Sequence, residues 1–373
     1  MRRFSLALIL VLTFALTAFG QKFHFGYDED DFGIPDAPAR TNPFENASSE
    51  LSKPNVPSRK DPFRNPNFVK TPTQLAAEFA AIKKAKIQFT GAMPNAPQPV
   101  LNAAFSVVPM KRGQEELRSL MLFRAVVGLP FADMTLDKTQ TAHAAAGAGI
   151  LSVIGHLDHT PEKPSGMNDE VYKWGYKGTS SGNLHMAGGD SGSQGSVRAY
   201  MNDSDPNNIK CLGHRRWCIN PYMKTTGFGE KGRWSVMYSF DSSRPKNEFD
   251  YNYFSFPACG LTPVNMFEAK WAWSLVLNPG KYRYLGDDQF KISVRPAMFN
   301  AKTAALKRLD VQPLELDSVK VDQAGYGVPL CVIFRPSPVQ VSPGMAYCVD
   351  IDGFATPQGP THIQYFVVFC KGL

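Results

Sequence analysis

The spacing of apolar residues changes along the chain, from a helical period in its first half to the short runs typical of strands later. Between Leu117 and Val127 large apolar residues recur every three or four positions, and a Gly-Leu-Pro sequence at 128–130 then ends the helix. The segment 71–87 predicts a shorter helix, with Thr71 or Thr73 as its cap. The alanine-rich segment 135–159 predicts another helix, whose small side chains would allow close packing.

The C-terminal part of the chain predicts β structure. Four segments of strand length are rich in branched and aromatic residues and are separated by Pro and Gly turns. They are residues 289–296, 329–336, 345–354 and 362–370. This spacing favours a small β-sandwich domain at 286–373, after a boundary near 280–287. Residues 161–210, by contrast, predict loops interrupted by one short helix at 196–203.

The beginning of the chain predicts export. Residues 1–20 start with two arginines after Met1 and continue in an apolar run too short for a secure membrane span, followed by small residues. This pattern is typical of a secretory signal peptide cleaved after Gly20. Residues 21–70 are rich in Pro, Asn, Asp and Ser and predict a disordered arm, and 71–112 a helical lead-in. We therefore expect a secreted protein, extracellular or periplasmic, with no transmembrane segment in its mature part.

The net charge of the chain and the distribution of its basic residues indicate which kinds of binding partner to expect. The formal net charge of +7 suggests attraction to an anionic extracellular surface. Nucleic acid is not expected as a partner, because the basic residues are scattered and no ribbon of alternating aromatic and basic residues recurs.

The cysteines predict disulfides. Six cysteines, all in the C-terminal half, form an even set in a chain predicted to be exported. Three disulfides are therefore expected, in a pairing that the sequence leaves open, although Cys211 and Cys218 are close enough in the chain to bridge one another. No Cys-x-x-Cys pair indicates a cysteine metal site.

Histidines supply the candidate chemistry. His156 and His159 are three residues apart, so on a helix they would share a face. A metal site needs further ligands from elsewhere, and His214 is the best candidate, with His185 as another. Zn²⁺ is the ion that this set would suit, although isolated histidines more often hydrogen-bond to the backbone. No serine-nucleophile elbow, paired-carboxylate motif or phosphate-binding loop is found.

Four motifs follow one another between Leu117 and Gly229. They are LMLFRAVVGLPFADMTLD at 120–137, TQTAHAAAGAGILSVIGHLDHTP at 139–161, SSGNLHMAGG at 180–189 and LGHRRWCINPYMKTTGFG at 212–229. In this order they resemble the bacterial form of the CAP domain, the family of cysteine-rich secretory, antigen 5 and pathogenesis-related proteins, also called SCP. The resemblance implies an α+β fold with an α-β-α sandwich at 113–285, ahead of the β-sandwich.

The resemblance also implies a cleft lined by two histidines and two acidic residues. His159 takes the position of the first cleft histidine, and His214 matches the histidine of the bacterial "GHR" string. Asn183 would hold loop backbone, and His156 lies close enough in the chain to join the cleft. Gly182 stands where the family has a glutamate, so one acid is missing. The cleft set is therefore incomplete.

These observations favour a binding module over an enzyme. Its cleft would accept a small hydrophobic ligand, lipid-like or sterol-like, or a divalent metal such as Zn²⁺ held by His159 and His214. One alternative is a metal-assisted extracellular hydrolase of peptides or wall polymer. With Gly182 in place of the glutamate, its general base would come from the carboxylates of Asp158, Glu162, Asp169 or Asp190. Another alternative is an adhesion or assembly protein with a vestigial cleft.

For the stretch 211–229 itself, we expect Arg215 and Arg216 to clamp carboxylates or carbonyls across the helical layer. Gly227 and Gly229 would let the following strand pack closely against a helix.

Overall fold

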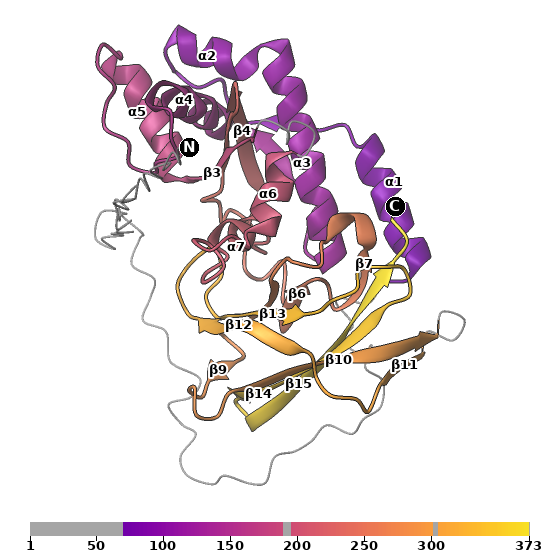
Figure 1. Cartoon of the computed structure of the whole chain (residues 1–373). Helices are drawn as coiled ribbons and strands as arrows, with labels where there is room; N and C mark the ends of the chain where they lie inside the picture. Colours follow the sequence, from indigo (N-terminus) through magenta and orange to yellow (C-terminus); the bar gives the residue numbers. More distant parts are fainter. Residues whose placement is uncertain (1–69, 189–194, 301–304, 373) are drawn as a thin grey trace, which may run out of the picture. The chain divides into compact units, whose positions relative to one another are not determined.

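The computed structural model describes residues 70–188, 195–300 and 305–372. The predicted signal peptide and residues 21–69 of the predicted arm lie outside the described residues, as does Asp190. The described part of the chain is a mixed α+β structure with seven α-helices and three sheets (Figure 1). The predicted α+β class is therefore confirmed.

The first half of the described chain contains the helices and one sheet. The helices are α1 (Pro72–Lys84), α2 (Gln98–Phe105), α3 (Val107–Val127), α4 (Lys138–Ile154), α5 (Asp169–Ser180), α6 (Ser196–Asn202) and α7 (Gly213–Cys218). The strands are β1 (Phe89–Thr90), β2 (Thr135–Asp137), β3 (Gly182–Met186), β4 (Thr225–Lys231) and β5 (Trp234–Tyr238). They form one sheet in the order β1-β2-β4-β5-β3, parallel at β1/β2 and β2/β4 and antiparallel elsewhere.

Local signals explain several helix ends. Thr71 caps α1 with a complete capping box, as the sequence suggested. Gly128 and Gly155 are left-handed and end α3 and α4, with φ of 80° and 77°. The predicted extension of the second long helix to residue 159 is wrong, because the chain leaves the helix at Gly155. The structure also contains α5 inside the region predicted as loops.

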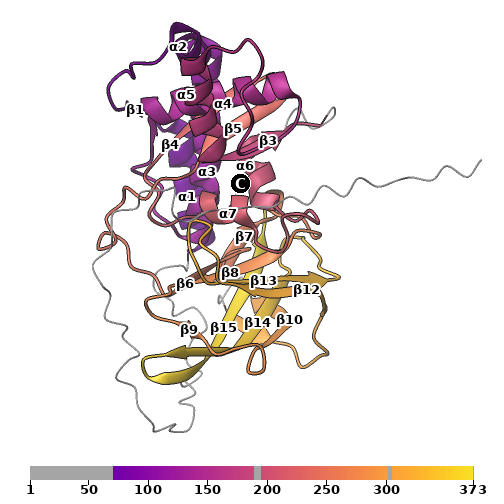
Figure 2. The same cartoon turned by 90° about the vertical axis from the view of Figure 1, so that its left-hand side faces the viewer.

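Helices cover both faces of this sheet (Figures 1 and 2). On one face α4 packs directly on β4, since a Cβ on Gly229 would lie 2.1 Å from the backbone nitrogen of Ala145. On the other face α3 packs on β4, since a Cβ on Gly113 would lie 3.8 Å from the Cβ of Phe228. The close approach predicted for Gly227 and Gly229 is confirmed.

The second half of the described chain forms two further sheets. One has the order β11-β10-β14-β15-β7, with β9 beside β14, and the other has the order β12-β13-β8-β6. Their strands are β6 (Tyr253–Phe256), β7 (Gly260–Pro263), β8 (Trp273–Leu277), β9 (Arg283–Tyr284), β10 (Lys291–Asn300), β11 (Ala305–Arg308), β12 (Glu315–Asp322), β13 (Cys331–Ser337), β14 (Ala346–Thr356) and β15 (Gly359–Cys370). The sheets therefore draw strands from both sides of residue 285.

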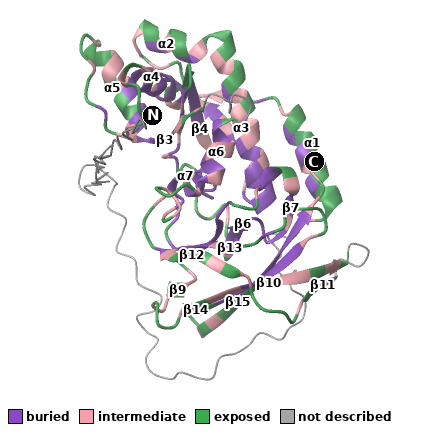
Figure 3. Ribbon diagram, in the orientation of Figure 1, coloured by how far each residue is buried: buried purple, intermediate pink, exposed green. Residues whose placement is uncertain are grey.

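One large apolar core joins the helical layer to these sheets. It includes Leu117 and Leu120 from α3 together with Trp273 from β8 and Phe369 from β15, all at most 3 % exposed. Figure 3 shows this burial concentrated along the strands and the inner sides of the helices. Within the described residues, no helix combines the length and the apolar character needed to cross a membrane.

The predicted disulfides are not formed. All six cysteines are described, and each carries a free thiol. Cys218 is fully buried, with its Sγ 3.6 Å from the Nδ2 of Asn183 and 3.9 Å from the Sδ of Met237, whereas Cys211 lies with its Sγ near the carbonyl of Asn208. Most of these thiols act as small buried side chains, and burial raises the pKa of Cys259 to about 12.

Candidate functional site

His214 is held by a buried carboxylate. Its Nδ1 lies 2.8 Å from the Oδ1 of Asp203, which is only 4 % exposed and follows the end of α6. The other carboxylate oxygen of Asp203 accepts a hydrogen bond from the backbone N–H of Arg215 at 3.2 Å. Because Nδ1 is fixed in this way, the orientation of the His214 ring is set. Its Nε2 has no hydrogen-bond partner among the described residues.

Two further residues frame His214. Asn183, buried in β3, donates from Nδ2 to the carbonyl of His214 at 2.9 Å, so it holds the backbone of α7. Tyr200 of α6 donates from its hydroxyl to the carbonyl of Asn183 at 2.9 Å and stacks its ring against His214, with centroids 5.7 Å apart. The expected backbone-holding role of Asn183 fits this geometry, although the backbone it holds is helical.

His159 and His185 lie near His214. The ring of His185, on β3, lies nearly perpendicular to the Tyr200 ring, with centroids 6.2 Å apart, and neither of its ring nitrogens has a hydrogen-bond partner among the described residues. The Nδ1 of His159 lies 2.9 Å from the carbonyl oxygen of Thr179. Both imidazoles are near enough to His214 to sense its charge. We call His159, His185 and His214 the histidine cluster.

The three rings differ in how readily they gain a proton. Burial opposes charge on His214, but the negative charge of Asp203, the hydrogen bond to it and the charge of Asp205 together raise the pKa of His214. Burial lowers the pKa of His159 and of His185, and the positive charge of His214 lowers both further. As the pH falls, the cluster therefore takes its first positive charge on His214.

His156 does not join the cluster. It is exposed, and its Nδ1 lies 3.1 Å from the carbonyl oxygen of Ile154, at the end of α4. The expectation that His156 and His159 share a helical face is wrong, because Gly155 ends the helix before either of them.

The carboxylates considered as general bases are engaged elsewhere or lie at the surface. Asp158 accepts from the backbone N–H of Thr160 at 2.8 Å, and Asp169 forms an exposed ion pair with Lys163. Glu162 is exposed. At position 182 a side chain has no room, since a Cβ there would lie 2.7 Å from the carbonyl oxygen of Gly178. Glycine at position 182 is thus required by this packing.

The sequence predicted that His159 and His214 could bind a metal ion, and the arrangement of possible ligands bears on this prediction. Within 70–188, 195–300 and 305–372, no group of three or more His, Cys, Asp or Glu side chains is arranged to hold a metal ion. His159 turns its Nδ1 to a carbonyl and His214 turns its Nδ1 to Asp203.

Sequence reasoning missed Asp203 and Tyr200. Asp203 was visible only as the middle residue of an Asn-Asp-Ser triplet, and nothing local marks it as the partner of a histidine eleven residues later. The backbone of Asp203 is left-handed, with φ of 46°, but this unusual conformation can be seen only in the folded chain and not in the sequence. Tyr200 lies on the short helix that the sequence did predict.

Arg215 and Arg216 make the fold-holding contacts expected of them. Arg215 donates to the carbonyls of Met201, Asn202 and Ala272 at 2.7, 2.6 and 2.7 Å. Arg216 forms a buried ion pair with Asp322 and donates to the carbonyl of Val328. The two guanidinium groups thereby fix α7, and with it His214, to the sheets of the second half of the chain.

The chain was also compared with known proteins. No protein-family model, no curated protein and no solved structure matches it.

Proposed function

We propose that the chain is a secreted binding module of the CAP type, whose histidine cluster binds the acidic head group of a small amphipathic ligand. The ordered motifs between Leu117 and Gly229 support the family. The packing of α4 and α3 on opposite faces of β4 fits the α-β-α sandwich that the family implies.

The observation that carries the proposed activity is the contact of His214 with Asp203. A buried carboxylate on Nδ1 favours the imidazolium form, which leaves Nε2–H as a donor without a partner in the described structure. His185, whose ring nitrogens lack hydrogen-bond partners there, supplies a second polar contact. A carboxylate or similar acceptor would satisfy these donors, and a charge-assisted hydrogen bond of this kind is among the stronger ones.

Calorimetric titration tests this proposal with octanoate as the probe and octanol as a probe that lacks the charge. We expect octanoate to bind more tightly at pH 6 than at pH 8, because His214 loses its proton as the pH rises. His214→Gln should weaken octanoate binding about tenfold or more.

His156→Gln is the matched control, since that ring is exposed and outside the cluster. It should bind octanoate as the natural chain does. Equal binding of octanoate by the His214→Gln variant, or binding that does not change between the two pH values, would contradict the proposal.

A hydrolase is the second candidate, because an imidazole oriented by a buried carboxylate is also the arrangement of a general base. In a metal-free hydrolase neutral His214 would take a proton from an attacking water through Nε2, whereas in a metal-assisted one the same Nε2 would be a metal ligand. Zinc titration of the natural chain, of His159→Ala and of His214→Ala tests for a metal site in the histidine cluster. A zinc affinity lost in both variants would show that the cluster holds a metal, as a metal-assisted hydrolase requires, and would count against an acidic head group as the ligand.

A further inference from the structure

Glu116 is a largely buried carboxylate on α3 that contacts the start of α6. Its two carboxylate oxygens accept hydrogen bonds from the backbone N–H groups of Ser196 and Val197, at 2.9 and 3.2 Å. Burial raises the pKa of Glu116, and the two N–H groups partly offset this rise because they favour the charged form. The carboxylate and the start of α6 therefore stabilise one another.

Both ends of α6 are held by side chains from other helices. The first N–H groups of a helix need acceptors, but the N-cap of α6 is Gly195, which has no side chain to supply one. Glu116 takes that place, and a Cβ at position 195 would lie only 2.6 Å from its Oε1. At the other end, Arg215 of α7 donates to the carbonyls of Met201 and Asn202.

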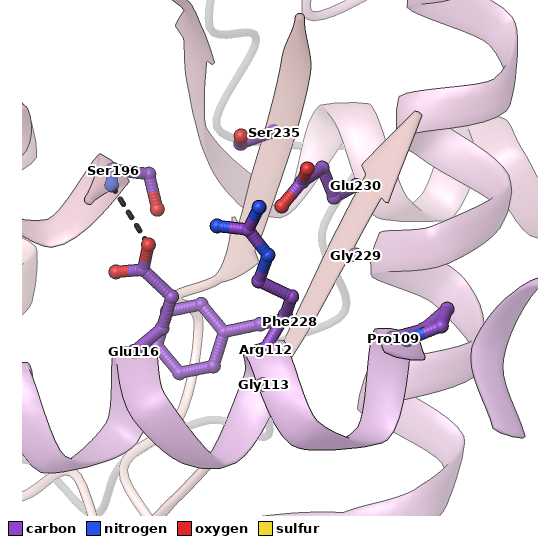
Figure 4. A pocket seen from close by; sticks show the side chains of 9 residues that line it. All are labelled: Pro109, Arg112, Gly113, Glu116, Ser196, Phe228, Gly229, Glu230 and Ser235. Carbon is purple, nitrogen blue, oxygen red and sulfur yellow. Dashed lines mark hydrogen bonds between the residues drawn. The ribbon is translucent and has the colours of Figure 1, made fainter. Parts of the chain in front are cut away.

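Glu116 is also part of the wall of a small pocket, together with Arg112 of α3 and Glu230 of β4 (Figure 4). Figure 4 shows the hydrogen bond from the backbone nitrogen of Ser196 to the carboxylate of Glu116. Within the described residues, the exposed Glu230 makes no hydrogen bond to α6. The two carboxylates thus share a pocket, but only Glu116 holds the helix.

The two side chains that set the ring of His214 come from α6 and from the residue directly after it. Tyr200 stacks on the ring and donates from its hydroxyl to the carbonyl of Asn183. Asp203 follows the last residue of α6 and contacts the Nδ1 of His214. Burial raises the pKa of Tyr200, and the nearby negative charge of Glu116 raises it further. A shift of α6 would therefore displace both partners of His214 together.

We propose that Glu116 is a positioning residue for the histidine cluster, because by holding the start of α6 it sets Tyr200 and Asp203 against His214. Glu116 acts through the helix and not through its own charge, since the carboxylates that raise the pKa of His214 are those of Asp203 and Asp205. The inference rests on the proposed function only for the ligand that the cluster binds.

Titration of His214 by nuclear magnetic resonance in the full chain tests this inference. Glu116→Gln keeps the shape of the side chain but weakens its hydrogen bonds to α6, so Asp203 should loosen and the pKa of His214 should fall. Gly195→Ala keeps the charge but places a methyl group too close to the carboxylate, and the same pKa should again fall. At pH 6 both variants should bind octanoate about fivefold more weakly, the equivalent of a lost helix cap.

Two further variants serve as controls. Glu230→Gln removes a carboxylate from the same pocket without touching α6, so it should leave the pKa of His214 and the affinity for octanoate unchanged. In a chain that carries Glu116→Ala, adding Gly195→Ala should change neither quantity further, because the carboxylate that it displaces is gone.

The inference is overturned if the pKa of His214 stays the same in Glu116→Gln and in Gly195→Ala, even where their melting temperatures fall. It is also overturned if Glu230→Gln lowers this pKa as much as Glu116→Gln does. Should Glu116→Gln fail to fold, Gly195→Ala decides the matter alone. A natural chain that does not bind octanoate would refute the proposed function, whereas the pKa of His214 in these variants would still decide the role of Glu116.

Discussion

Replacing Gly229 by alanine is expected to destabilise the protein by about 3 kcal/mol or more. An added Cβ would lie 2.1 Å from the backbone nitrogen of Ala145 and 2.2 Å from the carbonyl carbon of Ala144. These are main-chain atoms in the middle of α4, so no side chain can rotate away to make room. Either β4 or α4 has to shift, and the core shared by α4, β4 and β5 loosens. Chemical denaturation measures the loss as a lower free energy of unfolding.

Gly149→Ala is the control on the same helix. Nothing lies within 4 Å of a Cβ built there, and alanine is the better helix former. This variant should be more stable than the natural chain by roughly 0.5–1 kcal/mol. If the two alanine variants showed the same stability, the close contact between α4 and β4 would be refuted.

Replacing Arg215 by methionine is expected to cost about 3–5 kcal/mol of folding free energy. Its guanidinium is fully buried and donates to three carbonyls and to the hydroxyl of Ser274. Burial lowers the pKa of Arg215 to about 10, yet the group stays charged at neutral pH. Methionine fills part of the volume but leaves the buried carbonyls without donors, which is the costly outcome. Thermal and chemical unfolding both report the change.

Arg335→Met is the matched control. Arg335 forms an ion pair with Asp317 at the surface, where such pairs contribute between about 0 and 1 kcal/mol. An Arg215 variant as stable as the Arg335 variant would show that the second half of the chain does not depend on this clamp.

The helices could be predicted from the sequence wherever periodicity and a terminal signal agree. Val127 ends α3 because Gly128 follows it, and Thr71 begins α1. The end of α4 was missed although Gly155 carries the same signal, because apolar residues continue on both sides of that glycine. The helix α5 was missed because its two packing residues, Gly175 and Gly178, resemble loop residues in sequence.

The candidate site was only partly visible in the sequence. His159 and His214 stand in motifs, but Asp203 is defined by a contact between the end of α6 and the start of α7. No local pattern encodes that contact. For the cysteines the sequence predicted contacts that the fold does not make. Their even number predicted three disulfides, whereas in the structure each of the six thiols is free.

Titration of the individual imidazoles by nuclear magnetic resonance tests the histidine cluster most directly. We predict that His214 titrates above the ordinary value of 6.5 and that His159 and His185 titrate below it. In His214→Gln the pKa of His159 and of His185 should rise, because a neighbouring positive charge is removed. The pKa of His143, which burial lowers without any contribution from His214, should not change. A His214 that titrates below 6.5, or a His159 and His185 that ignore its removal, would contradict the cluster.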